Sequence, residues 1–338
     1  MRLATLVLAA ASLATPTAAM AASYSDIISF GDSLSDPGNA SIATFGAVPG
    51  PGYATRSVPL VPFPVGYFTN PQSGSGPVGL WVDQLAAKLG VLDPLPFLGP
   101  TGGTNYAVAG ATTSSGLGNM NTQVGLFLTA NPAAPSNALY TLWGGGDDVF
   151  NGLNPVAAAD TIAGQILTLH AAGANNFLWL DLPLLGFTPE VSGNPALAAA
   201  ANAASAAFDA EWATRLAMLQ ALGINVTGLD INALFSNILA NPGAYGFTNV
   251  TTPCDVTPGC NPNTFLYWDP EHPTTYADSL VANAAFQALN PTPEPPTIVL
   301  LGLGGAFMAS AVFLRRRYAM KAVASEVSCR VAGNQSRA

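Results

Sequence analysis

Residues 24–33 read Tyr-Ser-Asp-Ile-Ile-Ser-Phe-Gly-Asp-Ser, and this stretch decides the fold. Residues 24–30 form a short β-favouring run that ends at a Gly-Asp-Ser turn, so the pattern predicts a strand that feeds a helix. A serine at such a turn, here Ser33, meets the backbone N–H groups and the favourable field of a helix N-terminus. Gly-Asp-Ser-Leu alone, however, is as compatible with an ordinary turn as with a nucleophile.

Further strands and helices alternate along the chain. Continuous apolar runs predict strands covered on both faces at residues 138–143, 176–182 and 224–229. Helices are predicted at residues 80–89, around Ile162, Ile166 and Leu169, at 196–222, and at 273–289 with Pro273 in the first turn. No repeat or long linker interrupts residues 22–290, so we expect a single domain there.

This alternation predicts a parallel sheet sandwiched by helices. Ligands bind to such sheets beyond the carboxyl ends of the strands. Ser33, Asp147 and Asp269 all lie at or beyond predicted strand ends or in late loops. The candidate chemistry is therefore expected at one edge of the sheet.

The charge of the chain is unevenly distributed. The 338 residues carry a formal net charge of -9, and only 9% of them are charged. Residues 23–296 hold 18 of the 19 acidic residues but only three of the ten basic ones, namely Arg56, Lys88 and Arg215. Such a body has no basic patch for phosphate backbones, so nucleic acid is excluded as a partner. Neutral substrates suit it better than anionic ones.

The N-terminus predicts a secretory signal peptide over residues 1–21. Arg2 precedes an apolar run, and the segment ends in the small-residue exit Ala19-Met20-Ala21. A buried first helix is the alternative interpretation. Export would permit disulfides, and Cys254 and Cys260 lie six positions apart in a Pro/Gly/Asn-rich loop. These two cysteines are interpreted either as a small disulfide ring or as two free thiols.

The C-terminus predicts a membrane segment. Residues 291–296 form a stiff Pro-rich spacer, and residues 297–314 are 18 uncharged residues, long enough as a helix to span a bilayer core. Residues 315–338 form a basic tail that begins with three arginines, which mark the cytoplasmic side.

The Pro-Glu-Pro spacer, apolar helix and arginine cluster together resemble the PEP-CTERM sorting signal of Gram-negative bacteria. This resemblance implies an exosortase as processing partner and delivery to the cell envelope or the extracellular matrix. The tail of residues 318–338 departs from the usual pattern, because such signals end soon after the arginines. A plain C-terminal anchor is the alternative.

A second chemical motif lies near the end of the predicted domain. Trp-Asp-Pro-Glu-His-Pro, residues 268–273, places Asp269 three residues before His272 in a Pro-bounded loop. A serine nucleophile needs a base to take its proton, and a carboxylate to orient that base. The chain has only two histidines, and His170 falls in a predicted helix, where it is interpreted as a packed or solvated residue. His272 is therefore the candidate base, although a helix-capping role beside Pro273 is the alternative.

Together these motifs resemble the GDSL family of esterases and lipases, also called SGNH hydrolases. The resemblance spans roughly residues 27–289 in consistent order. Its blocks are the Gly-Asp-Ser-Leu of residues 31–34, Gly-Thr-Asn-Tyr-Ala-Val-Ala-Gly-Ala at 103–111, Leu-Trp-Gly-Gly-Gly-Asp-Asp at 142–148, Asp-Leu-Pro-Leu-Leu-Gly-Phe-Thr-Pro at 181–189, Tyr-Gly-Phe-Thr-Asn-Val at 245–250, and the Asp269–His272 loop.

The resemblance implies a three-layer α/β/α sandwich with a mostly parallel five-stranded sheet, and ester hydrolysis through an acyl-enzyme without metal or organic cofactor. Ser33 would attack the ester carbonyl, His272 would act as base and then as acid, and Asp269 would orient His272. The oxyanion hole would use the backbone N–H groups of Ser33 and Gly110 and the side chain at position 147.

Position 147 departs from the family pattern. The family's third block carries an asparagine where this chain has Asp147. An ionised carboxylate only accepts hydrogen bonds and would repel an oxyanion. Burial and the neighbouring Asp148 would raise the pKa of Asp147, and a protonated Asp147 would donate a hydrogen bond as a neutral acid. The alternative is that Asp147 has turned away and that the enzyme is weak.

Two functions therefore remain open. The first is an exported serine hydrolase of carboxylic esters, with small-molecule, lipid or polysaccharide esters as substrates. The second is a catalytically impaired surface or matrix protein that binds through the same fold. The Gly/Pro-rich segment 47–77 contains several aromatic residues and is interpreted either as a wall of the binding cleft or as a simple surface loop.

Overall fold

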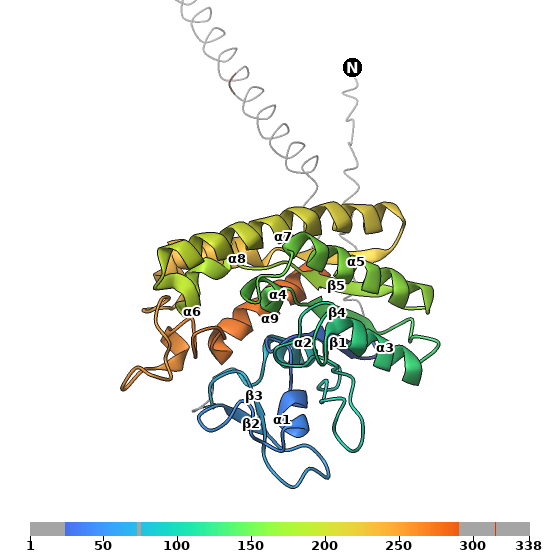
Figure 1. The fold of residues 1–338 in the computed structure, drawn as a ribbon, viewed down its shortest axis with the longest axis horizontal. Helices are drawn as coiled ribbons and strands as arrows, with labels where there is room; N and C mark the ends of the chain where they lie inside the picture. Colours follow the sequence, from blue (N-terminus) through green and yellow to red (C-terminus); the bar gives the residue numbers. More distant parts are fainter. Residues whose placement is uncertain (1–23, 73–75, 291–314, 316–338) are drawn as a thin grey trace, which may run out of the picture. The chain divides into compact units, whose positions relative to one another are not determined.

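The computed structural model of the protein describes residues 24–72, 76–290 and 315 (Figure 1). Ala21–Asn290 form one compact unit. The predicted signal peptide (1–21), spacer (291–296), membrane helix (297–314) and, apart from Arg315, tail (315–338) lie outside the described residues. Within the described ranges, no helix combines the length and hydrophobicity that crossing a bilayer requires.

Parallel strands form the centre of this unit. They are β1 (Ile27–Gly31), β4 (Leu139–Trp143), β5 (Asn176–Leu180) and β6 (Asn225–Leu229), in the spatial order β1-β4-β5-β6. Every residue of β1 and β4 is buried. A strand covered on both faces reads as a continuous apolar run rather than an alternating one, which is why the sequence predicted these strands. The parallel sheet is confirmed.

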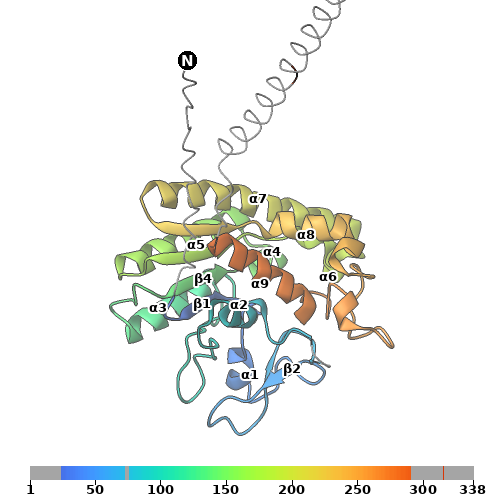
Figure 2. The same ribbon diagram turned by 180° about the vertical axis from the view of Figure 1, so that it is seen from behind.

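Helices cover both faces of the sheet (Figures 1 and 2). Tyr140 and Phe177 belong to the core on one face, and Leu139 and Leu178 to the core on the other, because successive strand residues point to opposite sides. The first face is covered by α3 (Met120–Ala130), α5 (Pro155–Ala171) and α7 (Pro195–Ala221). The second face is covered by α2 (Trp81–Leu89), α8 (Ile231–Ala240) and α9 (Thr275–Leu289).

The described part of the sheet has four strands, where the resemblance implied five, so that expectation was wrong. A segment around Asn105 lies beside β1 but bridges it at one position only. Tyr106 N donates to Ser29 O at 2.8 Å. The next rung would come from the N–H of Gly31, but this group donates to Gln123 Oε1 at 2.9 Å. A side chain thus takes this ladder position and interrupts the pairing, although Val108 N still donates to Gly31 O at 3.2 Å.

The helix predicted at 273–289 begins later than expected. Thr274 is the N-cap of α9, and its hydroxyl accepts a hydrogen bond from Ala277 N at 3.2 Å. Pro273 therefore precedes the cap and does not lie in the first turn. Threonine is a strong N-cap because its side-chain oxygen satisfies an amide that the helix leaves free.

The segment 47–77 contains an antiparallel hairpin that the sequence did not predict. Its strands are β2 (Ala54–Arg56) and β3 (Val65–Tyr67), which lie beside the short helix α1 (Asn39–Ala43) and are coloured blue in Figure 1. The Arg56 guanidinium lies 4.8 Å from the centre of the Tyr67 ring. The remaining short elements are α4 (Gly146–Phe150), α6 (Pro189–Ser192) and the 3₁₀ turns at Leu185–Phe187, Pro242–Tyr245 and Pro262–Thr264.

Candidate active site

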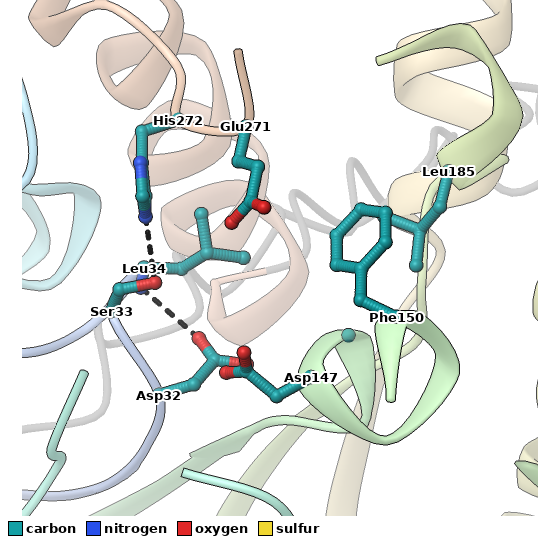
Figure 3. Close-up of a pocket in the computed structure, with 9 residues that line it drawn as sticks. Asp32, Ser33, Leu34, Asp147, Phe150, Leu185, Glu271 and His272 are labelled. Carbon is teal, nitrogen blue, oxygen red and sulfur yellow. Dashed lines mark hydrogen bonds between the residues drawn. The ribbon is translucent and has the colours of Figure 1, made fainter. Parts of the chain in front are cut away.

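A pocket lies beyond the carboxyl ends of β1 and β4, at the sheet edge that the sequence predicted (Figure 3). It contains Ser33 and His272 together with Asp147. Its lining residues are Asp32, Ser33, Leu34, Gly146, Asp147, Phe150, Leu185, Glu271 and His272. The polar wall thus comes from the first and last parts of the folded body and from Asp147 of α4, and Phe150 and Leu185 close the apolar side.

Ser33, His272 and Asp269 form a continuous hydrogen-bonded chain. His272 Nε2 lies 2.7 Å from Ser33 Oγ, and His272 Nδ1 lies 2.6 Å from Asp269 Oδ2. With Nδ1 donating to the carboxylate, Nε2 is free to accept the serine proton. This is the geometry in which a base activates a hydroxyl nucleophile.

Asp269 is held in its ionised form. Its Oδ1 accepts hydrogen bonds from the backbone N–H groups of Glu271 and His272, at 2.8 and 2.7 Å. Burial opposes ionisation, but the hydrogen bond and charge of His272 outweigh it, so the pKa of Asp269 is lowered from its ordinary value. A lowered carboxyl pKa suits a group whose task is to orient and stabilise an imidazolium.

Two aromatic residues of the unpredicted hairpin region contact this loop. The Tyr53 hydroxyl donates to Asp269 Oδ2 at 2.8 Å, and the Phe68 ring lies 4.7 Å from the His272 ring, centre to centre. Neither residue had a role predicted from the sequence. Their segment, interpreted as a cleft wall or a simple surface loop, contacts Asp269 and His272 but contributes no residue to the described pocket lining.

Ser33 lies on a single turn and not at the start of a helix, so that part of the prediction was wrong. Ser35 N donates to Asp32 O at 3.1 Å to close the turn, and the next helix, α1, begins only at Asn39. Gly31 ends β1 so close to β4 that a Cβ atom there would collide with the carbonyl oxygen of Trp143. Glycine is therefore required immediately before the turn.

Gly110 lies in a segment that is tied to the turn of Ser33. Asp36 is buried, and its Oδ2 accepts from Ala109 N at 2.9 Å and from Ala40 N at 3.0 Å. Asn105, also buried, donates through Nδ2 to Ser35 O at 2.8 Å. Gly110 has a φ of 76°, a left-handed conformation that favours glycine. It is not among the residues that line the pocket.

Asp147 lies in the first turn of α4 and faces the pocket. Burial and the charges of Glu271 and Asp148 raise the pKa of Asp147 to about 6, against the opposing charge of His272. Asp148 points elsewhere, because its two oxygens accept from the hydroxyl and the N–H of Thr113, both at 2.8 Å. Asp147, in contrast, lines the pocket, so the alternative that its carboxyl has turned away does not hold.

A further carboxyl group, that of Asp32, lies beside Asp147 in Figure 3. Asp32 is buried, and one of its oxygens accepts from Leu34 N at 3.0 Å. Burial and the charge of Asp147 raise the pKa of Asp32 well above its ordinary value. Asp32 was predicted only as part of a turn, although its place directly before the serine was a signal.

The pocket is strongly acidic. Its described lining residues include the carboxyl groups of Asp32, Asp147 and Glu271 but no lysine or arginine. His272 is the only basic side chain among them. In the described part of the chain, no cluster of three or more His, Cys, Asp or Glu side chains is arranged to hold a metal ion.

The remaining candidates lie away from the pocket. His170 is on α5, half-buried, and its Nδ1 lies 2.9 Å from Ala174 O, which is compatible with the packed or solvated role predicted for it. Cys254 and Cys260 form a disulfide, the first of the two interpretations left open. Their ring is tied to the chain just before Asp269, because Cys254 N donates to Tyr267 O at 3.1 Å.

Comparisons with known proteins point to one family. A family described as GDSL-like Lipase/Acylhydrolase matches residues 27–285. Esterase EstA of Pseudomonas aeruginosa is 29% identical over 330 residues, covering 83% of this chain and 49% of the esterase. Thermolabile hemolysin of Vibrio parahaemolyticus is 27% identical over 293 residues, covering 78% of this chain and 63% of the hemolysin.

One further relative and one solved structure are also similar to this chain. An uncharacterized protein of Pseudomonas putida, from the trpE-trpG intergenic region, is 30% identical, covering 79% of this chain and 49% of that protein. The crystal structure of the acetylxylan esterase Axe2 from Geobacillus stearothermophilus superposes with a TM-score of 0.43 at 15% identity, covering 80% of this chain and 95% of Axe2. The chain spans about half the length of the first of its curated relatives.

Proposed function

We propose that this chain, which belongs to the GDSL-like lipase/acylhydrolase family, is a serine hydrolase that cleaves carboxylic esters through an acyl-enzyme on Ser33. The observation that carries the proposal is the chain of contacts from Ser33 Oγ to His272 Nε2, 2.7 Å, and from His272 Nδ1 to Asp269 Oδ2, 2.6 Å. These distances are those at which a proton moves between heavy atoms.

The proposed reaction runs in two halves. Ser33 Oγ attacks the ester carbonyl carbon while His272 Nε2 takes the hydroxyl proton, and the tetrahedral intermediate then expels the alcohol, which receives that proton. Water repeats the sequence on the acyl-enzyme, so that the carboxylic acid leaves and Ser33 regains its proton. Throughout, Asp269 stabilises the imidazolium of His272.

The oxyanion would be stabilised by the N–H groups of Ser33 and Gly110 and by a protonated Asp147. Only the neutral acid can donate a hydrogen bond at that position. The raised pKa of Asp147, about 6, supports this role under mildly acidic conditions. We therefore expect ester hydrolysis to decline as the pH rises through 6.

The same value favours a second candidate function at neutral pH. Above a pKa of about 6, Asp147 is ionised and faces the place where negative charge would develop. A protein that works only at neutral pH would then be a weak enzyme, and binding of a ligand at this pocket would be its function. Activity at acid pH distinguishes the two candidates.

The pocket favours uncharged esters. No lysine or arginine is among the described residues that line the pocket, so an anionic group next to the scissile bond would find no cationic partner there. Small-molecule esters, neutral lipid esters and acetylated polysaccharides all meet this requirement. The named esterase and hemolysin relatives add support for ester chemistry in general.

We further propose that the protein acts outside the cytoplasm. The basis is the secretory pattern of residues 1–21 and the PEP-CTERM-like segment 291–317, with an exosortase as processing partner and the membrane segment as a temporary anchor. The Cys254–Cys260 disulfide adds support, because such bonds persist in oxidising compartments.

The test uses the purified full chain with p-nitrophenyl acetate, butyrate and octanoate at pH 5.5 and 8. We expect turnover that is faster at pH 5.5, and a loss of at least about 10³-fold in Ser33→Ala. Ser35→Ala is the matched control, because its hydroxyl accepts from Trp81 Nε1 at 3.1 Å and does not line the pocket. Absence of both turnover and fluorophosphonate labelling at either pH would leave the binding function.

A further inference from the structure

The segment that contains the β2–β3 hairpin contacts the loop of Asp269 and His272 at several points. Beyond Tyr53 and Phe68, the hydroxyl of Thr69 donates to Pro273 O at 3.1 Å, and Asn70 Oδ1 accepts from Thr275 N at 2.7 Å. Thr69 and Asn70 are buried. The segment that follows β3 is therefore fastened to the residues directly after His272, and Tyr53 is presented to Asp269 from a fixed support.

Tyr53 completes the hydrogen bonding of Asp269. Oδ1 accepts from the N–H groups of Glu271 and His272, while Oδ2 accepts from His272 Nδ1 and from the Tyr53 hydroxyl. A carboxylate offers about four lone-pair positions, so all of them are filled. Tyr53 provides the one side-chain donor to this carboxylate other than the histidine itself, as far as the described residues go.

We propose that Tyr53 is a positioning residue for hydrolysis: its hydroxyl fixes Asp269 Oδ2, and through it the ring of His272, against Ser33. The proposal rests on the proposed ester hydrolysis. Without the hydroxyl, Oδ2 is held by His272 alone, and the carboxylate and imidazole can rotate together away from Ser33. The rate of the chemical step falls when the base is displaced, even by a fraction of an ångström.

The hydroxyl also offsets part of the negative charge on Oδ2. When it is removed, the charge on Oδ2 that faces the imidazole of His272 loses one of its two hydrogen-bond donors. The other titratable groups that face this pair are Glu271 and Asp255 from the same segment and Asp147 from α4. They remain in Tyr53→Phe and act equally on both proteins.

If the Tyr53 ring acted only through packing, Tyr53→Phe would behave like the wild-type protein. The Tyr53 ring makes edge contacts with Phe68, at 5.7 Å between centres, and with Trp268, at 6.5 Å. Phenylalanine keeps these contacts and removes only the hydroxyl. Tyr140→Phe is the matched control, because its hydroxyl donates to Pro135 O at 2.9 Å and Tyr140 does not line the pocket.

The experiment measures kcat, KM and the pH profile of p-nitrophenyl butyrate hydrolysis by the full chain. For Tyr53→Phe we expect kcat to fall about 3- to 10-fold and KM to stay within about twofold, as for the loss of one positioning hydrogen bond. Tm should fall no further than in Tyr140→Phe, which also loses one hydroxyl hydrogen bond. An unchanged kcat, a KM that rises in proportion to the loss, or an equal kcat loss in Tyr140→Phe would overturn the proposal.

A second measurement is independent of turnover. The proton on His272 Nδ1 should give a downfield NMR resonance, with the His170 proton, which faces Ala174 O, as internal reference. We expect the His272 resonance to shift in Tyr53→Phe and to stay in place in Tyr140→Phe. An unchanged resonance in Tyr53→Phe would refute the positioning role, even if the wild-type chain hydrolysed no ester and the proposed function had failed separately.

Discussion

Ser33 lies between two regions that treat carboxyl groups in opposite ways. On the side of His272, the carboxylate of Asp269 accepts four hydrogen bonds, and its pKa is lowered. On the side of Asp147, the carboxyls of Asp147 and Asp32 lie beside each other, and burial raises the pKa of both (Figure 3). The difference in pKa follows the supply of donors, since both regions are mostly buried.

This contrast teaches that the two regions beside Ser33 need their carboxyl groups in different protonation states for the proposed reaction. In the proposed mechanism, the relay of Asp269 and His272 uses an ionised carboxylate, and the oxyanion region uses a protonated one. Both conditions are met together only near and below pH 6, where Asp147 still holds its proton. Each of the following substitutions changes one region and leaves the other in place.

The largest effect is expected from Asp269→Asn. The amide cannot accept from Tyr53, His272 Nδ1 and two backbone N–H groups as a carboxylate does, and it favours the wrong histidine tautomer. We expect kcat to fall by about 10³- to 10⁴-fold at all pH values. Steady-state kinetics on p-nitrophenyl butyrate measure the loss, and far-UV circular dichroism verifies folding. A variant within tenfold of wild type would mean that the hydrogen-bonded relay is not used.

The next largest effect is a gain in Asp147→Asn. Asparagine restores a neutral donor that does not titrate, so at pH 8 we expect kcat/KM to rise by about 10- to 100-fold. At pH 5 the two proteins should differ little, because Asp147 is already protonated there. The decline above pH 6 should disappear from the profile. A substitution that lowers the rate at every pH would contradict the role of a protonated Asp147.

The same substitution should change stability with pH. Because the pKa of Asp147 is raised to about 6 in the folded chain, folding retains its proton, and the free energy of unfolding falls as the pH rises from about 4 to 6. The loss is about 2 kcal/mol after allowance for partial exposure. Asp147→Asn has no carboxyl group at this position to titrate. The Tm of the variant minus the Tm of the wild type should therefore be roughly 5 °C larger at pH 7.5 than at pH 4. Equal differences at both pH values would mean that Asp147 titrates normally.

The smallest effect is expected from Asp32→Asn. Burial and the charge of Asp147 raise the pKa of Asp32 well above its ordinary value, which favours the neutral form of this carboxyl. Asparagine is also neutral, and its oxygen can still accept from Leu34 N. We expect kcat/KM at pH 7 to change by less than about threefold. A loss of the size expected for Asp269→Asn would show that Asp32 carries a charge that the reaction needs.

Much of the fold could be predicted because burial leaves a direct trace in the sequence. Strands β4 and β5 are continuous apolar runs, and α7 is an alanine-rich segment. The β2–β3 hairpin leaves no such trace, because its strands have three residues each within a Gly/Pro-rich segment. The expected fifth strand does not form beside β1, because the Gln123 side chain accepts the hydrogen bond of the Gly31 N–H that would continue the ladder. This contact depends on the tertiary fold.

The candidate site divides in the same way. Ser33, Asp269 and His272 could be selected because each lies in a local motif and the chain has few alternatives for the base. Tyr53 could not, because its partner lies 216 residues away and nothing in its neighbourhood distinguishes it from other aromatic residues. The raised pKa of Asp147 was expected from burial and Asp148, but the contribution of Glu271 depends on the folded pocket.

The separation of Ser33 from His272, 239 residues, also has a consequence for synthesis. The ribosome incorporates the serine early and the histidine only when most of the polypeptide has emerged. If the proposed relay is correct, a nascent or prematurely terminated product holds the hydroxyl without its proton acceptor, and we expect it to be inert toward esters. In a protein proposed to be made in one compartment and to work in another, the order of translation alone keeps the reaction silent until the body is nearly finished.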